Sequence, residues 1–180
     1  MITWANATSK KCIDLAAGNT TNGDEVELWD CNGLIQQQWI VDPAKGTIQL
    51  GVDSTKCLDN LGGSTAPGNR VGLWDCIPGD ASQQWSYDDS AQTIILKENT
   101  TVGANSLCLD LPSADPSNGN WLEIWGCNGL VNQQWTMQKA LPPLIPCHSP
   151  EKCPGGVPCP TSGACPPPSV PLQTDRQTDG

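Results

Sequence analysis

The stretch that decides the fold runs from Cys108 to Trp135 and reads CLDLPSADPSNGNWLEIWGCNGLVNQQW. Two further copies precede it, CIDLAAGNTTNGDEVELWDCNGLIQQQW over 12–39 and CLDNLGGSTAPGNRVGLWDCIPGDASQQW over 57–85. Each copy contains Cys-x-Asp, then Leu/Ile-Trp-x-Cys, then Gln-x-Trp, and its two cysteines are 19 positions apart. Three copies with matched internal spacing form an internal repeat, which predicts a fold built from equivalent units.

Each copy is predicted to form short β-strands joined by turns. Apolar and polar residues alternate with the period of a strand at 26–29, 47–50, 71–74, 93–96 and 121–125. Glycine, asparagine and proline cluster between these segments, and no segment has the apolar period of a helix. The sequence therefore predicts an all-β domain over 1–139, with repeats at about 2–46, 47–91 and 92–139. Closing the repeats around a pseudo-threefold axis would remove exposed sheet edges.

The composition changes after Lys139. Residues 140–180 are rich in proline, and the segment is predicted to be a tail or linker without regular structure. Its four cysteines recur every six residues, at Cys147, Cys153, Cys159 and Cys165. They can pair with one another as disulfides in three ways, and the sequence does not choose between them. A zinc site beside His148 is the alternative, but zinc ligands are usually spaced two to four residues apart.

The net charge limits the classes of binding partner, and the cysteine content indicates the cellular compartment. The net charge of −10 argues against a nucleic-acid partner and against anionic membranes. Ten cysteines in 180 residues indicate an oxidising compartment, and sequons at Asn6, Asn19 and Asn99 agree with a secreted glycoprotein. No apolar run is long enough for a membrane-spanning helix, so no membrane insertion is expected. No signal peptide is visible in residues 1–11.

The three Cys-x-Asp, Leu/Ile-Trp-x-Cys and Gln-x-Trp sets resemble the ricin B-type lectin family. This family is also described as the QxW-repeat β-trefoil carbohydrate-binding module, of the family 13 type. The resemblance covers about residues 2–139 and implies a β-trefoil of twelve strands, six in a barrel and six in a hairpin cap. It also implies one disulfide within each repeat: Cys12–Cys31, Cys57–Cys76 and Cys108–Cys127. Closing a loop of about 20 residues stabilises a domain by about 3 kcal/mol in the chain-entropy model.

The resemblance assigns the repeated side chains to a core and to a sugar site. Trp39, Trp85 and Trp135 are expected in the core, where each large indole would fill space near the axis. The other repeated tryptophans would stack on the C–H face of a sugar ring. A carboxylate and an amide at the edge of that indole would bind the sugar hydroxyls.

Carried over residue by residue, the sugar-binding set differs between the repeats. In the third repeat it comprises Asp110, Glu123, Trp125, Asn132 and Gln133, and in the first Asp14, Glu27, Trp29, Gln36 and Gln37. In the second it comprises Asp59, Gly72, Trp74, Ser82 and Gln83. Gln36 replaces the usual asparagine, and Gly72 and Ser82 remove two polar contacts, so the predicted order of strength is third, first, second. Trp121 shares a strand face with Trp125, where it would widen the platform or pack.

The predicted function is non-catalytic binding of glycans, with galactose- or xylose-type sugars implied by the resemblance and no cofactor or metal expected. The alternative for single residues is that each aspartate caps a turn and each tryptophan is shallow core. An enzyme could use Asp110 and Glu123 as a glycosidase pair, but the only histidine, His148, lies in the tail. Two alternatives remain: a targeting module of a larger glycoside hydrolase or toxin, and a protein-binding trefoil such as a protease inhibitor.

Overall fold

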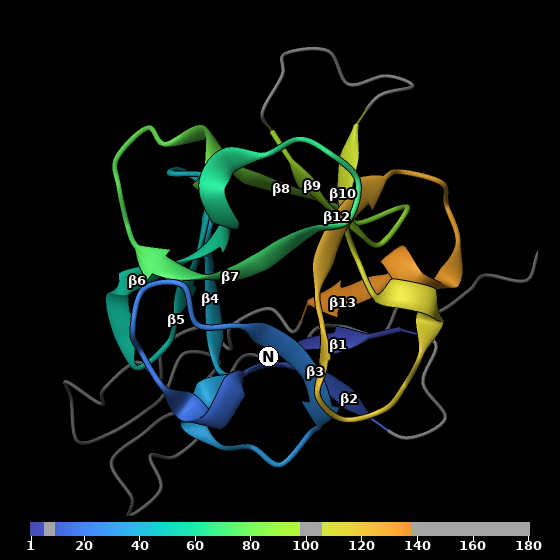
Figure 1. Ribbon diagram of the computed structural model, residues 1–180, viewed down its shortest axis with the longest axis horizontal. Coiled ribbons are helices and arrows are strands. Elements are labelled where there is room, and N and C mark those ends of the chain that lie inside the picture. The colour runs from blue at the N-terminus through green and yellow to red at the C-terminus, as the bar shows by residue number, and fades with distance from the viewer. Residues whose placement is uncertain (6–9, 98–105, 138–180) are drawn as a thin grey trace, which may run out of the picture. The chain divides into compact units, whose positions relative to one another are not determined.

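Figure 1 shows the computed structural model of the chain, which describes residues 1–5, 10–97 and 106–137. Regular structure in these ranges consists of β-strands and short 3-10 turns. The strands are β1 (Ile2–Trp4), β2 (Lys11–Leu15), β3 (Val26–Asp30), β4 (Trp39–Asp42), β5 (Thr47–Leu50), β6 (Asp53–Asn60), β7 (Asn69–Asp75), β8 (Trp85–Asp88), β9 (Thr93–Leu96), β10 (Leu107–Asp110), β11 (Asn120–Trp121), β12 (Glu123–Gly126) and β13 (Trp135–Met137). The 3-10 turns are η1 (Ala16–Gly18), η2 (Ile35–Gln37), η3 (Leu61–Gly63), η4 (Ala81–Gln83), η5 (Pro112–Ala114) and η6 (Val131–Gln133).

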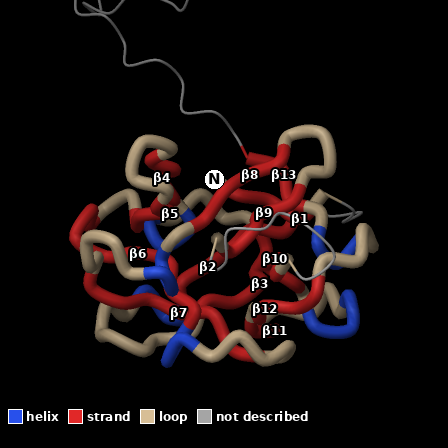
Figure 2. The backbone as a smooth tube through the Cα atoms, turned by 90° about the horizontal axis from the view of Figure 1, so that it is seen from above, coloured by secondary structure: helices blue, strands red, loops and turns tan. Residues whose placement is uncertain are grey.

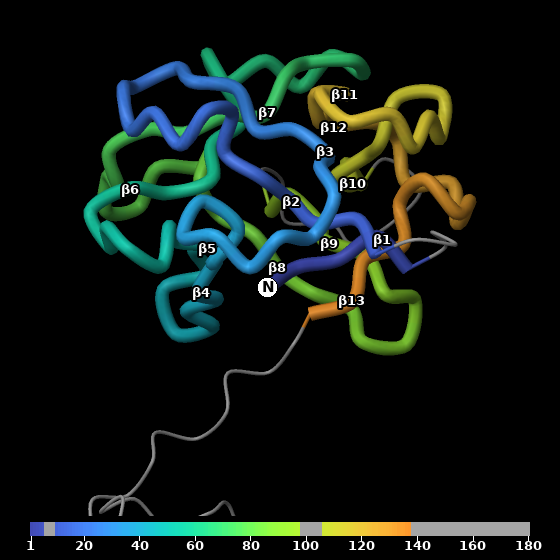
Figure 3. The backbone as a smooth tube through the Cα atoms, turned by 90° about the horizontal axis from the view of Figure 1, so that it is seen from below, coloured from blue at the N-terminus to red at the C-terminus, as the bar shows by residue number. Residues whose placement is uncertain are grey.

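The strands are arranged as three equivalent hairpin units. The hairpins β2–β3, β6–β7 and β10–β12 share one antiparallel register, in which Asp14, Asp59 and Asp110 lie opposite Glu27, Gly72 and Glu123. In Figure 1 the strands β3, β7 and β12 surround the centre of the view, one from each repeat. The first and last described strands, β1 and β13, pair side by side and join the ends of the domain (Figure 3). The predicted all-β trefoil of three repeats is confirmed.

The third repeat departs from the expected four strands because its third strand is split. Leu122 lies between β11 and β12, and its backbone N–H donates to the carbonyl O of Val26 in the first repeat at 2.9 Å. Its own carbonyl O accepts from the N–H of Val71 in the second repeat at 3.0 Å. Leu122 therefore joins all three repeats at the axis. Figure 2 shows β7, β11 and β12 at the end of the domain opposite β4, β8 and β13.

The tryptophans of the Gln-x-Trp motifs occupy the core, as the sequence predicted. Trp39, Trp85 and Trp135 are buried, and each indole N–H donates to a backbone carbonyl O in its own repeat. The acceptors are Ile13 at 3.1 Å, Leu58 at 2.9 Å and Leu109 at 3.0 Å. Since a buried indole needs a partner for its single polar group, these bonds allow the rings to fill the interior without an unpaired donor.

Three disulfides join the hairpins of the described residues, and they are the pairs that the resemblance implied. The bonds are Cys12–Cys31, Cys57–Cys76 and Cys108–Cys127, with Cα–Cα distances of 5.1, 5.0 and 5.1 Å. Each bond links the strand that carries the repeated aspartate to the residue that follows the next strand. The spacing between aspartate and tryptophan is therefore held by the covalent framework in all three repeats.

Neighbouring repeats are also held by polar contacts, but only two of the three borders have the same set. At the border of the first and third repeats, Lys11 Nζ lies 2.8 Å from Asp30 Oδ1 and donates to Asn118 Oδ1 at 2.7 Å. Lys56, Asp75 and Asn22 repeat this arrangement between the second and first repeats. At the remaining border the equivalent positions are Leu107, Gly126 and Pro67.

The described residues belong to one compact unit, Met1–Gln138. None of the described helices has the length and apolar character needed to cross a membrane. The predicted tail over 140–180, its cysteines and the sequons at Asn6 and Asn99 lie outside the described residues. Asn19 lies within them and is exposed.

Candidate functional site

A buried carboxylate held by a glutamine is the common centre of the three candidate sites. The aspartate of each Cys-x-Asp accepts a hydrogen bond on Oδ2 from the side-chain amide of the Gln-x-Trp glutamine. The Nε2–Oδ2 distances are 2.6 Å for Gln37–Asp14, 2.8 Å for Gln83–Asp59 and 2.8 Å for Gln133–Asp110. The chain brings each pair together because the 3-10 turns η2, η4 and η6 each end at the glutamine, which is buried.

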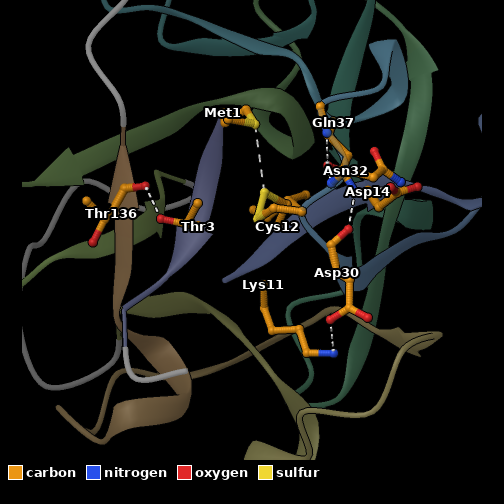
Figure 4. Close-up of a disulfide and its surroundings, with 12 residues drawn as sticks. Met1, Thr3, Lys11, Cys12, Asp14, Asp30, Asn32, Gln37 and Thr136 are labelled. Atoms are coloured by element: carbon orange, nitrogen blue, oxygen red, sulfur yellow. Dashed lines mark hydrogen bonds and ion pairs between the residues drawn. A yellow bond between two sulfur atoms is a disulfide. The ribbon is translucent and has the colours of Figure 1, made fainter. Parts of the chain in front are cut away.

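The glutamine is itself fixed by the backbone. Gln37 Nε2 also donates to the carbonyl O of Asp30 at 2.9 Å, and its Oε1 accepts from the N–H of Asn32 at 2.9 Å. Figure 4 shows Gln37 close to Asn32 and Asp14, with Asp30 nearby. The other two glutamines make the same kinds of bonds. Because every polar atom of the amide has a partner, the carboxylate that it binds is held in one orientation.

The third repeat adds a second amide to this carboxylate. Asn132 Nδ2 lies 2.9 Å from Asp110 Oδ1 and 2.8 Å from Oδ2. Among the contacts of the described residues, no hydrogen bond joins Gln36 to Asp14 in the first repeat. The longer side chain of Gln36 instead lies near Gly18, where a built Cβ would be 3.8 Å from Gln36 Oε1. In the first repeat the carboxylate of Asp14 therefore lacks the second amide bond that Asn132 makes to Asp110 in the third.

The repeated tryptophans Trp29, Trp74 and Trp125 lie at the surface beside these carboxylates. Their exposed fractions are 39%, 38% and 45%, so they are not core residues. Strand register places Trp125 opposite Cys108 and two residues from Glu123, on the same face of the hairpin as Asp110. The exposed indole and the buried carboxylate therefore face one site.

Each exposed indole packs against a glycine turn of another repeat. A Cβ built on Gly119, Gly23 or Gly68 would lie 3.9, 3.7 or 3.7 Å from Cζ3 of Trp29, Trp74 or Trp125, respectively. All three glycines have positive φ, between +87° and +92°, a conformation that other residues seldom adopt. One edge of each indole is thus held while the rest remains exposed.

The carboxylates of the first and third sites have raised pKa values. Burial raises the pKa of Asp110, against the opposing effect of hydrogen bonds from Gln133 and Asn132. Burial, followed by the charge of Asp110, raises the pKa of Glu123. Asp14 and Glu27 show the same directions for the same leading cause, burial. Burial is thus the leading cause at all four groups, and the charge of the facing aspartate adds to it at Glu123 and Glu27.

The second site lacks this second carboxylate, and its backbone does not admit one. A Cβ built on Gly72 would lie 2.6 Å from the carbonyl O of Asp24 and 2.7 Å from Cδ1 of Leu61. The side chain of Leu61 therefore occupies part of the space that Glu123 has in the third repeat. Because the nearest atom belongs to the backbone, a glutamate at position 72 would require the neighbouring repeat to shift.

Sequence reasoning missed that each site straddles a border between repeats. The residue opposite Glu123 is Arg70 of the second repeat, and the residue opposite Glu27 is Trp121 of the third. Glu25 of the first repeat lies opposite Gly72. These three residues stand two positions before Glu27, Gly72 and Glu123 in the aligned repeats. That equivalence was visible in the sequence, but the pairing across repeats was not.

Three repeated hairpins, each with a carboxylate fixed beside a surface indole, define a β-trefoil of the carbohydrate-binding type. The model of the ricin-type beta-trefoil lectin domain matches residues 2–135, and the chain belongs to this family. The family and its fold support carbohydrate binding by a domain that is not itself catalytic.

Solved structures agree on the fold. The designed 3-fold symmetric protein ThreeFoil is similar with a TM-score of 0.63 and 24% identity, over 74% of this chain and 93% of that one. The agglutinin from Abrus precatorius is similar with a TM-score of 0.57 and 24% identity, over 76% of this chain and 46% of that one. The earthworm R-type lectin C-half, solved in complex with GalNAc, is similar with a TM-score of 0.58 and 18% identity, over 71% of this chain and 89% of that one. No curated protein sequence matches the chain.

Proposed function

We propose that the domain binds glycans reversibly at two sites, centred on Asp110 and Trp125 in the third repeat and on Asp14 and Trp29 in the first. The observation that carries this proposal is the third site, where a buried carboxylate held by two amides faces an exposed indole. A sugar ring has a C–H face that stacks on an indole and hydroxyls at its rim that need fixed acceptors.

The binding mechanism follows from this geometry. Asp110 accepts hydrogen bonds from two adjacent hydroxyls, while Asn132 and Gln133 hold its orientation. Asn132 also presents its amide oxygen to the sugar. Glu123 offers a further acceptor from the same strand face. Charge-assisted bonds of this type contribute about 1.5–3 kcal/mol. A single shallow site is expected to bind at around millimolar strength, about −4 kcal/mol, and two sites on one rigid domain raise the strength on a polymeric glycan.

Galactose-type sugars are the first candidate ligands. Relatives of the same fold have been solved with GalNAc and with N-acetyl-D-lactosamine bound, the latter in the β-trefoil lectin of the Vibrio vulnificus hemolysin/cytolysin. Xylose-type sugars remain the second candidate because of the family 13 resemblance. The second repeat is proposed to bind weakly or not at all. Gly72 stands where the third repeat has Glu123, and the side chain of Leu61 lies against it.

The second proposal is that the domain is secreted and targets an attached protein to a glycan. The proline-rich sequence that follows the trefoil favours this role. In a mosquitocidal holotoxin, the region that resembles this chain is 17% of the protein, so this fold can form one part of a larger chain. The proline-rich residues 140–180 would then act as a linker, and the trefoil would bring its partner to a glycan. Neither Asp110 nor Glu123 is assigned a catalytic role.

A glycan array with competition by free sugar tests the proposal. The full chain should bind galactose- or xylose-terminated glycans, free sugar should compete, and Trp125→Ala should remove most of the signal. Binding to proteins that free sugar does not compete would instead support a protein-binding or inhibitor role. Thermal unfolding of the variant serves as the control for an intact fold.

A further inference from the structure

Three equivalent positions, one from each repeat, meet at the pseudo-threefold axis and carry three different side chains. Glu25 of the first repeat forms an ion pair with Arg70 of the second. The guanidinium of Arg70 lies 4.3 Å from the ring centroid of Trp121 in the third repeat. The following residues, Val26, Val71 and Leu122, are fully buried and close the core beneath this axial cluster.

The axial cluster is open to solvent. Trp121 is 39% exposed, as much as the site tryptophan Trp29, and the side chains of Arg70 and Glu25 are each 46% exposed. A cation over one face of an indole uses only part of the ring. Trp121 thus keeps apolar surface, and Arg70 keeps N–H donors that the ion pair with Glu25 does not use.

The cluster is continuous with the third site. Trp121, Glu123 and Trp125 point outward in alternation, while Leu122 and Ile124 between them are buried. Arg70 lies directly across from Glu123 on the neighbouring strand. At roughly 3.3 Å per strand residue, Trp121 and Trp125 are separated by about 13 Å along the chain. This span exceeds one sugar ring, so a monosaccharide bound at Trp125 does not reach Trp121.

We propose that Trp121 and Arg70 form a further saccharide subsite, which takes another ring of an oligosaccharide whose end is bound at Trp125 and Asp110. The inference rests on the proposed function and extends its third site along the row formed by Trp125, Glu123 and Trp121. The indole stacks on the C–H face of the further ring, and the guanidinium donates to its hydroxyls.

The surrounding charge selects a neutral ring. Glu25, Glu27 and Glu123 lie near the subsite, two of them opposite its members on neighbouring strands. A carboxylated or sulfated sugar would be repelled by these groups and would compete with Glu25 for Arg70. Neutral hydroxyls can donate to the same carboxylates. The subsite is therefore assigned to uncharged oligosaccharides.

Calorimetry with galactose and β-1,4-galactotetraose tests the subsite. The parent protein is the full chain with Asp14→Asn. This substitution disables the first site and keeps the shape of the side chain. The parent should bind the tetrasaccharide roughly 10-fold more tightly than galactose. Trp121→Leu and Arg70→Gln should each reduce this ratio to about one or two, because each variant loses more affinity for the tetrasaccharide than for galactose. Trp74→Leu, at an indole of similar exposure in the second repeat, should leave the ratio intact.

The outcomes separate a subsite from a purely structural cluster. If Trp121 and Arg70 only hold the repeats together, their variants will lower the thermal midpoint and keep the tetrasaccharide preference, which overturns the inference. A parent that binds both sugars equally overturns the subsite alone. A parent that binds neither sugar overturns the proposed galactose-type binding of the third site together with the subsite.

Discussion

The second and third repeats share one scaffold but differ at the rim of the site. Both have the disulfide, a buried aspartate held by glutamine and an exposed indole. The third adds Glu123 and Asn132, whereas the second has Gly72, with Leu61 against it, and Ser82. The comparison teaches that the aspartate–glutamine pair and the packed indole belong to the common scaffold of the repeats. Binding is expected to depend on the few rim positions that are free to differ.

The largest expected effect comes from removing the indole of the third repeat. Trp125→Ala should weaken galactose binding by more than about 10-fold, because the stacking surface is lost. Trp74→Ala should leave galactose affinity within about twofold of that of the unmodified chain. Titration calorimetry of the two variants measures both values, and equal losses would contradict the proposed difference between the repeats.

The carboxylates provide the next comparison. Asp110→Asn keeps the shape of the side chain but removes the charge and one acceptor, so binding should weaken by about 1.5–3 kcal/mol. Asp59→Asn makes the same change in the second repeat and should leave sugar affinity unchanged. The thermal midpoints of the two variants should fall together, since both aspartates accept from a buried glutamine. A loss of affinity in Asp59→Asn would show that the second repeat binds.

As the pH is lowered, the domain should lose sugar binding before it unfolds. The pKa values of Asp110 and Glu123 are raised, so both carboxylates become protonated, and lose acceptor capacity, at a higher pH than ordinary carboxyls. Protonation does not remove stability at these two groups, because a raised carboxyl pKa means that the folded state favours the proton. The hydrogen bonds from Lys11 and Lys56 lower the pKa values of Asp30 and Asp75, whose stabilising contribution is lost only at lower pH.

Galactose affinity should therefore fall as the pH drops through the raised pKa values, above the ordinary 3.8 of aspartate, while the domain stays folded. Calorimetry over a pH series, with circular dichroism on the same samples, measures the two transitions. Affinity that stays constant until the domain unfolds would rule out these carboxylates as acceptors.

The smallest effect is expected from repairing the first site. Gln36→Asn shortens the side chain to that of Asn132 and should let its amide donate to Asp14, improving binding by about 0.5–1 kcal/mol. The variant is compared with its parent in a Trp125→Ala background, where the first site dominates. Ser82→Asn in the second repeat is the matched control and should not restore binding, because Gly72 and Leu61 still exclude the second carboxylate.

Much of the fold and the inner part of the site could be predicted from the chain alone, because they depend on local spacing. The two cysteines of each repeat recur at a constant distance, and the structure pairs them within hairpins. The Gln-x-Trp motif places a tryptophan in the core and a glutamine on the aspartate of the same repeat. Strand alternation placed Trp121 and Trp125 on one outward face, as observed.

The sequence by itself determined the repeat and the strand class, and the family resemblance carried by its motifs implied the disulfide pairs and the aspartate–glutamine–tryptophan sets. Each of these features lies within one copy of the repeat. Only the tertiary structure decided what each copy receives from its neighbour: Gly68 beside Trp125, Arg70 opposite Glu123, and Leu61 with the backbone of Asp24 against Gly72. The physical reason is that closing three hairpins around an axis brings together residues that are about one repeat apart in the chain. Their contacts are set by packing between repeats, and no local pattern within one repeat records them.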